Sequence, residues 1–139
     1  MKIRDLLKIK GRPVITIRPT ETVAAAIQKL AEYDRGSIPV CNEKGELVGI
    51  ITERDIVRKC FVPMNTLASV KIEDVMTKGV AIGAPEDDFD YAISVMKQKR
   101  IRHLPIMEQQ HVVGMISMRD LLGVQLGETK AEIRYAGLL

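Results

Sequence analysis

The chain of 139 residues contains one long internal repeat, and that repeat limits the folds available to it. Residues 49–55 (GIITERD) return as residues 114–120 (GMISMRD), with Gly, a hydroxyl residue, Arg and Asp at the same spacing. Upstream, Pro19 pairs with Pro85, 66 positions on, whereas the paired glycines are 65 positions apart. A repeat this long predicts a supersecondary unit duplicated in tandem. We expect two half-domains that share one core rather than two independent domains.

Each repeat is predicted to be a β-α-β-β-α unit, which makes the fold class α+β. Apolar runs at 14–17 and 80–82 predict a first strand, and a proline ends each run. An amphipathic helix follows in each copy, with apolar residues at i, i+3, i+4 and i+7: Val23, Ala26, Ile27 and Leu30, then Phe89, Ala92, Ile93 and Met96.

Two further strands and a second helix complete each predicted unit. The second strands are expected at 38–41 and 104–107, and the third at 47–51 and 112–116. Each third strand continues into a helix that begins at Thr52 or Ser117. A proline lies within each second strand, which predicts an edge position or a strand start. Residues 72–76 (IEDVM) echo residues 3–7 (IRDLL) that precede the first repeat.

Composition excludes several classes of protein. Apolar residues make up 46% and charged residues 28%, as in ordinary globular proteins, and the net charge is only +3. No apolar run approaches the ~18 residues of a membrane span, and the first residues lack the apolar stretch of a signal peptide. Cys41 and Cys60 are too few and too far apart for a zinc ribbon or a disulfide framework, so free thiols in a reducing cytoplasm are expected.

The start of the last helix in each repeat carries the residues best suited to ligand chemistry. Both copies place a hydroxyl, an arginine and an aspartate there: Thr52, Arg54 and Asp55, and Ser117, Arg119 and Asp120. A helix N-terminus attracts phosphate, and arginine pairs with it. A carboxylate accepts two hydrogen bonds at once, which suits the vicinal diol of a ribose. The alternative is a helix cap, worth about 1 kcal/mol, which requires neither the arginine nor the preceding glycine. The two interpretations are compatible.

Several motifs together resemble a known family. Besides the repeated junctions, the motifs are two strands with an internal proline and one phrase of the linker: Ile38-Pro39-Val40, Leu104-Pro105-Ile106 and Asp74-Val75-Met76-Thr77. The sequence resembles a tandem pair of CBS motifs, named after cystathionine β-synthase and often called a Bateman module. The resemblance covers residues 1–125, with motif 1 at about 5–60 and motif 2 at about 72–125, and leaves a tail at 126–139. It is most similar to stand-alone pairs without an attached enzyme or transporter domain.

The resemblance implies a pseudo-twofold axis between the two repeats and two clefts that bind adenine-containing ligands. In each cleft the aspartate of one motif faces strands of the other. By position, Asp120 pairs with Thr16 and Ser37, and Asp55 pairs with Ile82, Arg102 and His103. The full set of implied ligand-binding residues is Thr16, Arg35, Gly36, Ser37, Ile51, Thr52, Arg54, Asp55, Ile82, Ile101, Arg102, His103, Ile116, Ser117, Arg119 and Asp120.

The predicted function is a non-catalytic regulatory module that binds AMP, ADP, ATP, NAD or an S-adenosylmethionine relative and acts through a homodimer or a regulated partner protein. No nucleophile elbow, Walker loop or metal-ligand spacing supports an enzyme, a catalytic cofactor or a metal site. One alternative is a protein-interaction subunit with vestigial clefts. Another is a nucleic-acid binder that uses the basic run 97–103, although an aromatic content of 4% disfavours base stacking. That run also fits a solvated helix end or a phosphate contact through Arg102 and His103.

Overall fold

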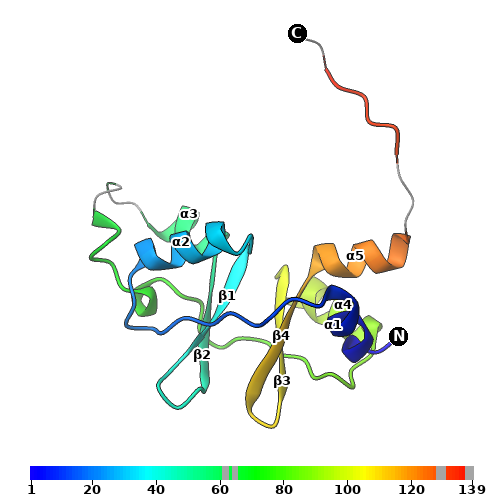
Figure 1. Ribbon diagram of the computed structural model, residues 1–139, viewed down its shortest axis with the longest axis horizontal. Coiled ribbons are helices and arrows are strands. Elements are labelled where there is room, and N and C mark those ends of the chain that lie inside the picture. The colour runs from blue at the N-terminus through cyan, green and yellow to red at the C-terminus, as the bar shows by residue number, and fades with distance from the viewer. Residues whose placement is uncertain (61–62, 64–65, 128–130, 137–139) are drawn as a thin grey trace.

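The computed structural model describes residues 1–60, 63, 66–127 and 131–136, and it consists of two similar halves side by side (Figure 1). The predicted tail residues 128–130 and 137–139, and parts of the linker at 61–62 and 64–65, lie outside this range. The first half comprises α2 (Val23–Glu32), β1 (Ser37–Cys41), β2 (Leu47–Thr52) and α3 (Glu53–Lys59). The second comprises α4 (Phe89–Lys99), β3 (His103–Glu108), β4 (His111–Ser117) and α5 (Met118–Leu126). Helix α1 (Ile3–Lys10) precedes both, and the 3-10 turn η2 (Ile72–Asp74) lies between them.

An antiparallel hairpin forms the sheet of each half. Ser37 faces Thr52 across β1 and β2, and His103 faces Ser117 across β3 and β4, so both hairpins deliver a hydroxyl residue to the same end. Each hairpin has a register shift at the equivalent place, between Val40 and Cys41 and between Ile106 and Met107. The second and third predicted strands are therefore confirmed, as is the α+β class with two repeats.

The first predicted strand of each repeat is wrong. Residues 14–17 and 80–82 form no strand, and a single parallel bridge remains in each half, Ile17 with Val40 and Gly83 with Ile106. In the first half the Ile17 N–H donates to Pro39 O at 3.2 Å, and the Cys41 N–H donates to Ile17 O at 2.9 Å. Extending this ladder in either direction requires the N–H of Pro39 or of Pro19, which proline lacks.

The two cores are separate, which corrects the expectation of one shared core. The first cluster of buried residues joins α2 to its hairpin and includes Val23, Ala26 and Leu30 of the predicted stripe. The second includes Ala92 and Met96 of α4. Between the halves lie cavities, described below, whose linings include carboxylates and guanidinium groups, and such groups cannot be packed into an apolar interior without partners.

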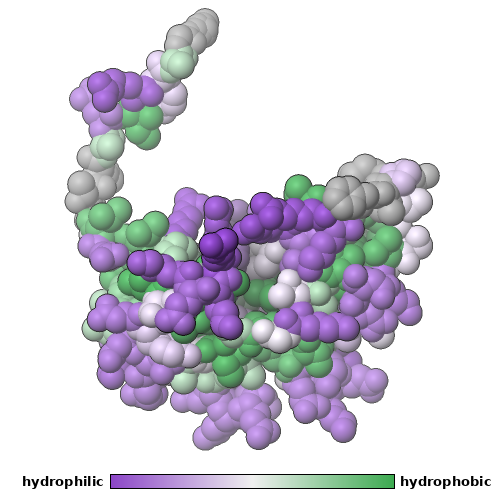
Figure 2. All heavy atoms as spheres, turned by 180° about the vertical axis from the view of Figure 1, so that it is seen from behind, coloured by the Kyte–Doolittle hydropathy of each residue, from purple (hydrophilic) through white to green (hydrophobic). Residues whose placement is uncertain are grey.

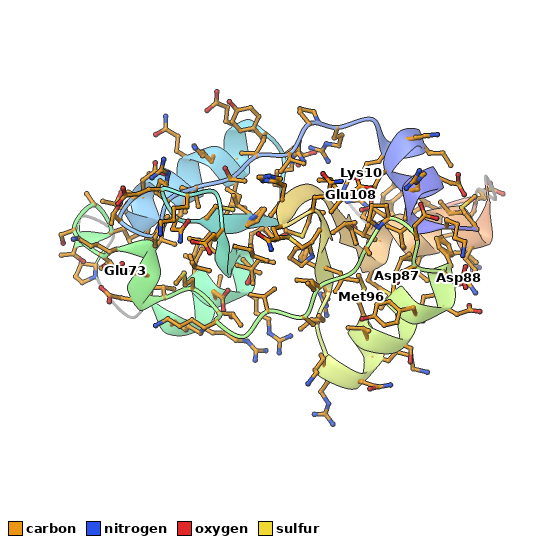
Figure 3. The ribbon with its side chains drawn as sticks, turned by 90° about the horizontal axis from the view of Figure 1, so that it is seen from below. Lys10, Glu73, Asp87, Asp88, Met96 and Glu108 are labelled. Carbon is orange, nitrogen blue, oxygen red and sulfur yellow. The ribbon has the colours of Figure 1, made fainter. Side chains whose placement is uncertain are left out.

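The segments that precede the repeats cross over between the halves. Ile3 and Leu6 of α1 are buried in the second core, although α1 precedes the first repeat. Ile72 and Val75, their echo in the linker, are buried in the first core. Seen from below, Figure 3 places Lys10 near the second half with Asp87, Asp88 and Met96, and Glu73 at the opposite end of the molecule. The exchange ties each half to the chain segment that precedes the other.

The repeated glycines lie where these exchanged segments approach the hairpins. A Cβ on Gly49 would lie 2.6 Å from Met76 Sδ and 2.9 Å from Thr77 O, and a Cβ on Gly114 would collide with the Leu7 side chain. Met76 and Leu7 occupy equivalent positions in the two echoed segments. Close packing at the crossover therefore explains both glycines.

The surface is polar around these elements. Figure 2 shows hydrophilic side chains along the lower edge, where Figure 1 places the two hairpin turns. Residues 131–136 are exposed and extend away from the body. Cys41 is buried and Cys60 half-buried, and both are free thiols whose pKa is raised by burial. Within the described ranges, no helix is long and apolar enough to cross a membrane.

Replacing Gly49 tests the crossover contact. Gly49→Ala is expected to lower the free energy of unfolding by about 1–3 kcal/mol, since the backbone oxygen of Thr77 cannot move aside as a side chain can. Urea denaturation measures the change. Gly123→Ala in α5 is the control: apart from its chain neighbours and its own helix backbone, no described atom lies within 4 Å of its added Cβ, and alanine favours a helix by roughly 0.5–1 kcal/mol. Equal stability of Gly49→Ala and the wild type would contradict the close approach.

Candidate functional site

Both repeated junctions form the same hydrogen-bonded cap. Thr52 Oγ1 accepts from the Asp55 N–H at 2.9 Å, and Asp55 Oδ2 accepts from the Thr52 N–H at 3.1 Å. In the second copy, Ser117 Oγ accepts from the Asp120 N–H at 3.0 Å, and Asp120 Oδ2 accepts from the Ser117 N–H at 2.8 Å. The capping interpretation therefore holds for both copies, and it uses one carboxylate oxygen of each aspartate.

The larger of the two cavities that contain a junction aspartate, here called the Asp120 cleft, measures about 710 Å³ and lies between the halves. That volume is within the usual ~300–1,000 Å³ of small-molecule sites. The second half contributes Ser117, Arg119, Asp120 and His103, and the first contributes Arg35, Gly36 and Ser37. The structure thus brings the aspartate of motif 2 to the segment of motif 1 that the resemblance assigned to it, apart from Thr16.

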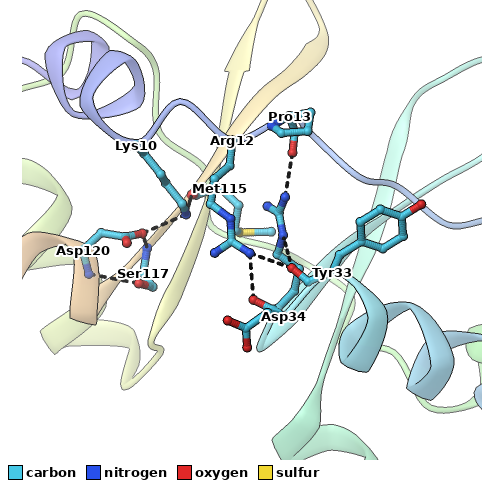
Figure 4. Close-up of polar contacts among 9 residues, drawn as sticks. Lys10, Arg12, Pro13, Tyr33, Asp34, Met115, Ser117 and Asp120 are labelled. Atoms are coloured by element: carbon cyan, nitrogen blue, oxygen red, sulfur yellow. Dashed lines mark hydrogen bonds and ion pairs between the residues drawn. The ribbon is translucent and has the colours of Figure 1, made fainter.

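A lysine from α1 contacts Asp120 inside this cleft (Figure 4). Lys10 Nζ lies 2.9 Å from Asp120 Oδ2 and donates to Met115 O at 2.6 Å. Burial raises the pKa of Asp120, but the hydrogen bonds from Lys10 and Ser117 outweigh it and leave that pKa below the ordinary value. Asp120 Oδ1 has no hydrogen-bond partner among the described residues. This carboxylate is therefore ionised and retains one oxygen that can accept from a ligand.

A small annex of about 50 Å³ opens beside the Asp120 cleft and shares Lys10, Arg12, Arg35, Ser37 and Met115 with it. Its apolar wall comes from both halves: Pro13, Val14, Ile15, Pro39 and Val113. Ser37 is only 5% exposed, and within the described part of the chain its Oγ has no hydrogen-bond partner. A buried hydroxyl without a partner is costly, and a ligand in the cleft could satisfy it.

Two arginines that line the same cleft donate to backbone carbonyls (Figure 4). Arg12 donates to Tyr33 O at 2.6 Å and to Asp34 O at 2.9 Å, at the end of α2. Arg35 donates to Tyr33 O and to Pro13 O, each at 3.1 Å. Burial, and next the neighbouring Arg12, lower the pKa of Arg35. Guanidinium groups positioned by neutral carbonyls keep their full charge for an anion.

The second cavity, here called the Asp55 cleft, measures about 400 Å³ and combines the first junction with the second half. Of the predicted residues it contains Gly36, Thr52, Arg54, Asp55, Ile101, Arg102 and His103. Asp55 differs from Asp120, since its Oδ1 accepts from Thr77 Oγ1 at 2.9 Å and lies 3.0 Å from Lys59 Nζ. Its Oδ2 also accepts from Thr52 Oγ1 at 3.0 Å. Both oxygens of Asp55 are therefore engaged within the chain.

His103 lies between the two clefts and lines both, together with Gly36 and Glu53. A Cβ on Gly36 would lie 3.0 Å from His103 Nε2, so the glycine lets the imidazole close against the opposite half. Burial, and next the positive charge of Lys10, lower the pKa of His103 below its ordinary value. A neutral imidazole therefore separates the two cavities at neutral pH.

Four of the residues assigned by resemblance lie outside both clefts. Ile51 and Ile116 are 0% exposed and belong to the two cores. Thr16 is exposed and its carbonyl accepts from Lys29, and the neighbouring Ile15 lines the annex. Ile82 is 45% exposed. Both Thr16 and Ile82 are assigned by position in the family resemblance, and in the structure neither lines either cleft.

The sequence analysis missed the cations that the crossover and α3 supply to the clefts. Lys10 and Arg12 line the Asp120 cleft, and Arg58, Lys59 and Arg100 line the Asp55 cleft. Arg100 belongs to the basic run 97–103, which the sequence shows directly. Lys10 is 110 positions from its partner Asp120, and no pattern near Lys10 in the sequence predicts their contact. Among the described residues, no group of three or more His, Cys, Asp or Glu side chains could hold a metal ion.

The fold and the two clefts define a duplicated α+β module in which each cleft is lined by residues of both repeats. The sequence model described as "CBS domain" matches the chain twice, at residues 3–61 and 72–127. Because these matches span most of the chain, the protein belongs to the CBS domain family and contains a tandem CBS pair.

Known proteins agree with this assignment. Protein MK0525 of Methanopyrus kandleri is 35% identical over 85% of this chain, and the match spans 61% of that protein's length. The crystal structure of the CBS domain protein NE2398 has a TM-score of 0.85 at 30% identity, covering 91% of this chain and 98% of that one. The CBS domain pair of protein MJ0100, in complex with 5′-methylthioadenosine and S-adenosyl-L-methionine, has a TM-score of 0.78 at 26% identity, covering 93% and 98%.

The Lys10–Asp120 contact has a pH dependence that can be measured. In Lys10→Met the pKa of the Asp120 carboxyl is expected to rise, because burial remains while the largest favourable contact is lost. An NMR titration of the side-chain carboxyl carbon follows this directly. A folded-state pKa below the unfolded value stabilises the protein at higher pH, so the stability lost in Lys10→Met should shrink as pH falls below about 3.9. An unchanged Asp120 pKa in this variant would contradict the contact.

Proposed function

We propose that the protein is a non-catalytic regulatory module that binds an adenosine-containing ligand in the Asp120 cleft. The observation that carries the proposal is the Asp120 carboxylate, which is ionised, lies in the inter-repeat cleft and keeps Oδ1 without a partner among the described residues. A single carboxylate oxygen can accept from both hydroxyls of a ribose diol. AMP, ADP, ATP, NAD and S-adenosylmethionine relatives all carry that group.

The remaining walls of the cleft suit the other parts of such a ligand. The apolar side chains Val14, Ile15 and Val113 of the annex support contact with a flat base. Ser37, whose Oγ has no partner among the described residues, supports a hydrogen bond to a ring nitrogen. Arg35 and Arg119 support a phosphate or carboxylate group in the cleft. The complex of the MJ0100 CBS pair with two adenosine derivatives supports the same ligand class for this chain.

Lys10 would link ligand binding at Asp120 to the position of α1. A diol that binds at Asp120 must share the carboxylate with Lys10, the last residue of α1, and α1 packs in the second core. Binding would therefore change the interaction of α1 with the cleft, and the free energy passed to a partner equals the ligand's differential affinity for the two arrangements. In this proposal the change at α1 acts on a partner protein that the module regulates.

A thermal-shift measurement tests the ligand. Adenosine, AMP, ATP, NAD and S-adenosylmethionine are compared; a ligand at 100 times its Kd adds about 2.7 kcal/mol, or roughly 5–10 °C for a domain of this size. Asp120→Asn should abolish the shift, because the amide presents a donor as well as an acceptor to the diol. Asp55→Asn is the matched control: it alters an equivalent cap but should keep the shift.

Two outcomes of this measurement would overturn the proposal. No shift of the wild type with any adenosine ligand at millimolar concentration would favour an interaction subunit with vestigial clefts. A shift with a short RNA instead, lost in moderate salt, would favour nucleic-acid binding through residues 97–103.

We also propose that the module is a homodimer, as the family resemblance implies. Exposed apolar side chains on α3 and α5 support this, with Val57 76% exposed and Leu122 47% exposed. Val57→Glu should convert the dimer to a monomer in sedimentation velocity, because a charge would be buried in the interface. Ile82→Glu, at an exposed isoleucine outside both helices, should leave the dimer intact. A monomeric wild type would contradict this proposal.

A further inference from the structure

The Asp55 cleft carries an excess of unpaired positive charge. Four arginines line it: Arg54 at the start of α3, Arg58 in its last turn, Arg100 at the end of α4 and Arg102 immediately before β3. Among the described residues, none of these four guanidinium groups has an ion-pair or hydrogen-bond partner. Like charges gathered around one concave surface repel each other, so an anion placed among them would lower the energy of all four.

The acidic groups of the cleft do not cancel this charge. The Asp55 carboxylate is paired with Lys59 at 3.0 Å and is only 9% exposed, against 23% for the Asp120 side chain. Glu53 is the other carboxylate among the described residues that line the cleft. Four arginines therefore face one unpaired carboxylate, and the net charge of the cleft is strongly positive.

The same contacts disfavour a ribose at this position. Both Asp55 oxygens already accept hydrogen bonds from within the chain, from Thr52 and Thr77, in addition to the contact with Lys59. A ribose diol would have to displace these partners, and a displaced buried partner costs roughly 1–3 kcal/mol. The residues that the resemblance assigns to a second nucleoside are thus arranged for charge rather than for a diol.

We propose that the Asp55 cleft is a binding site for a multiply charged phosphate chain, held by Arg54, Arg58, Arg100 and Arg102 without a ribose contact. Arginine suits this ligand because its planar fork donates two parallel hydrogen bonds to phosphate oxygens. This site goes beyond the adenosine function of the Asp120 cleft. Its phosphate chain has two sources: a free inorganic polyphosphate, or the phosphate tail of a nucleotide that extends past Gly36 and His103, which line both clefts.

Arg100 provides a variant that separates binding from folding. Its backbone is left-handed, with φ of 55°, a conformation that glycine adopts without strain. Arg100→Gly therefore removes one cation from the cleft while the thermal midpoint stays the same or rises. Arg102→Gln is a second variant, and Arg119→Gln is the matched control, because it removes an arginine from the Asp120 cleft only.

Isothermal titration calorimetry with inorganic tripolyphosphate at low ionic strength tests the proposal. We expect one tripolyphosphate to bind per chain, with affinity that falls as salt is added. Arg100→Gly and Arg102→Gln should each weaken binding by about tenfold or more, and Arg119→Gln by less than about twofold. No binding by the wild type, or an equal loss in Arg119→Gln, would overturn the phosphate site.

Two further ligands identify the source and keep the two proposals apart. Adenosine, which has no phosphate, reports on the Asp120 cleft, and its binding should be unchanged in Arg100→Gly. If adenosine does not bind while tripolyphosphate does, the adenosine proposal is wrong. If tripolyphosphate does not bind while adenosine does, the phosphate-site proposal is wrong. If ATP binds more tightly than adenosine and Arg100→Gly removes this increase in affinity, the phosphate chain in the Asp55 cleft belongs to a nucleotide that spans both clefts. If the increase is absent while tripolyphosphate binds, the ligand is a free polyphosphate.

Discussion

The hydrogen-bonded cap between a hydroxyl residue and an aspartate is the interaction on which the rest of the structure depends. It ties the first turn of α3 or α5 to the end of a hairpin and orients the aspartate toward the space between the halves. The cap uses one carboxylate oxygen, so the neighbours of the second oxygen decide what each cleft can bind. In Asp120 the cap and Lys10 use Oδ2, and Oδ1 has no partner among the described residues.

The crossover of the preceding segments makes two nearly identical motifs unequal. The α1 segment brings Lys10 to Asp120, where it shares Oδ2 with the cap. The linker brings Thr77 to Asp55, where it joins Lys59 at Oδ1. Repeats with the same hydroxyl and aspartate thus present one accessible carboxylate oxygen in one cleft and none in the other. The two clefts therefore differ in the hydrogen-bonding capacity of their aspartates, although the motifs themselves are repeated.

Local elements were predictable because their causes are local. The apolar stripe of α2, both hairpins and both caps follow from spacings of a few residues, and the structure confirms them. The first strands were predicted wrongly, although the reason was visible in the sequence: Pro19 and Pro39 remove the N–H groups on either side of the Ile17 bridge. Thr16 and Ile82, which the resemblance assigns by position, line neither cleft.

The sequence alone determined the duplication, the class of fold and the two aspartates at the helix starts, because repetition and periodicity are properties of the chain itself. Only the tertiary structure decided which cations face each aspartate. Lys10 meets Asp120 across 110 positions, and Arg100 and Arg102 meet the first junction across the interface of the halves. Such pairings depend on how the exchanged segments pack, and no spacing along the chain encodes them. The two clefts are therefore alike in sequence and different in charge.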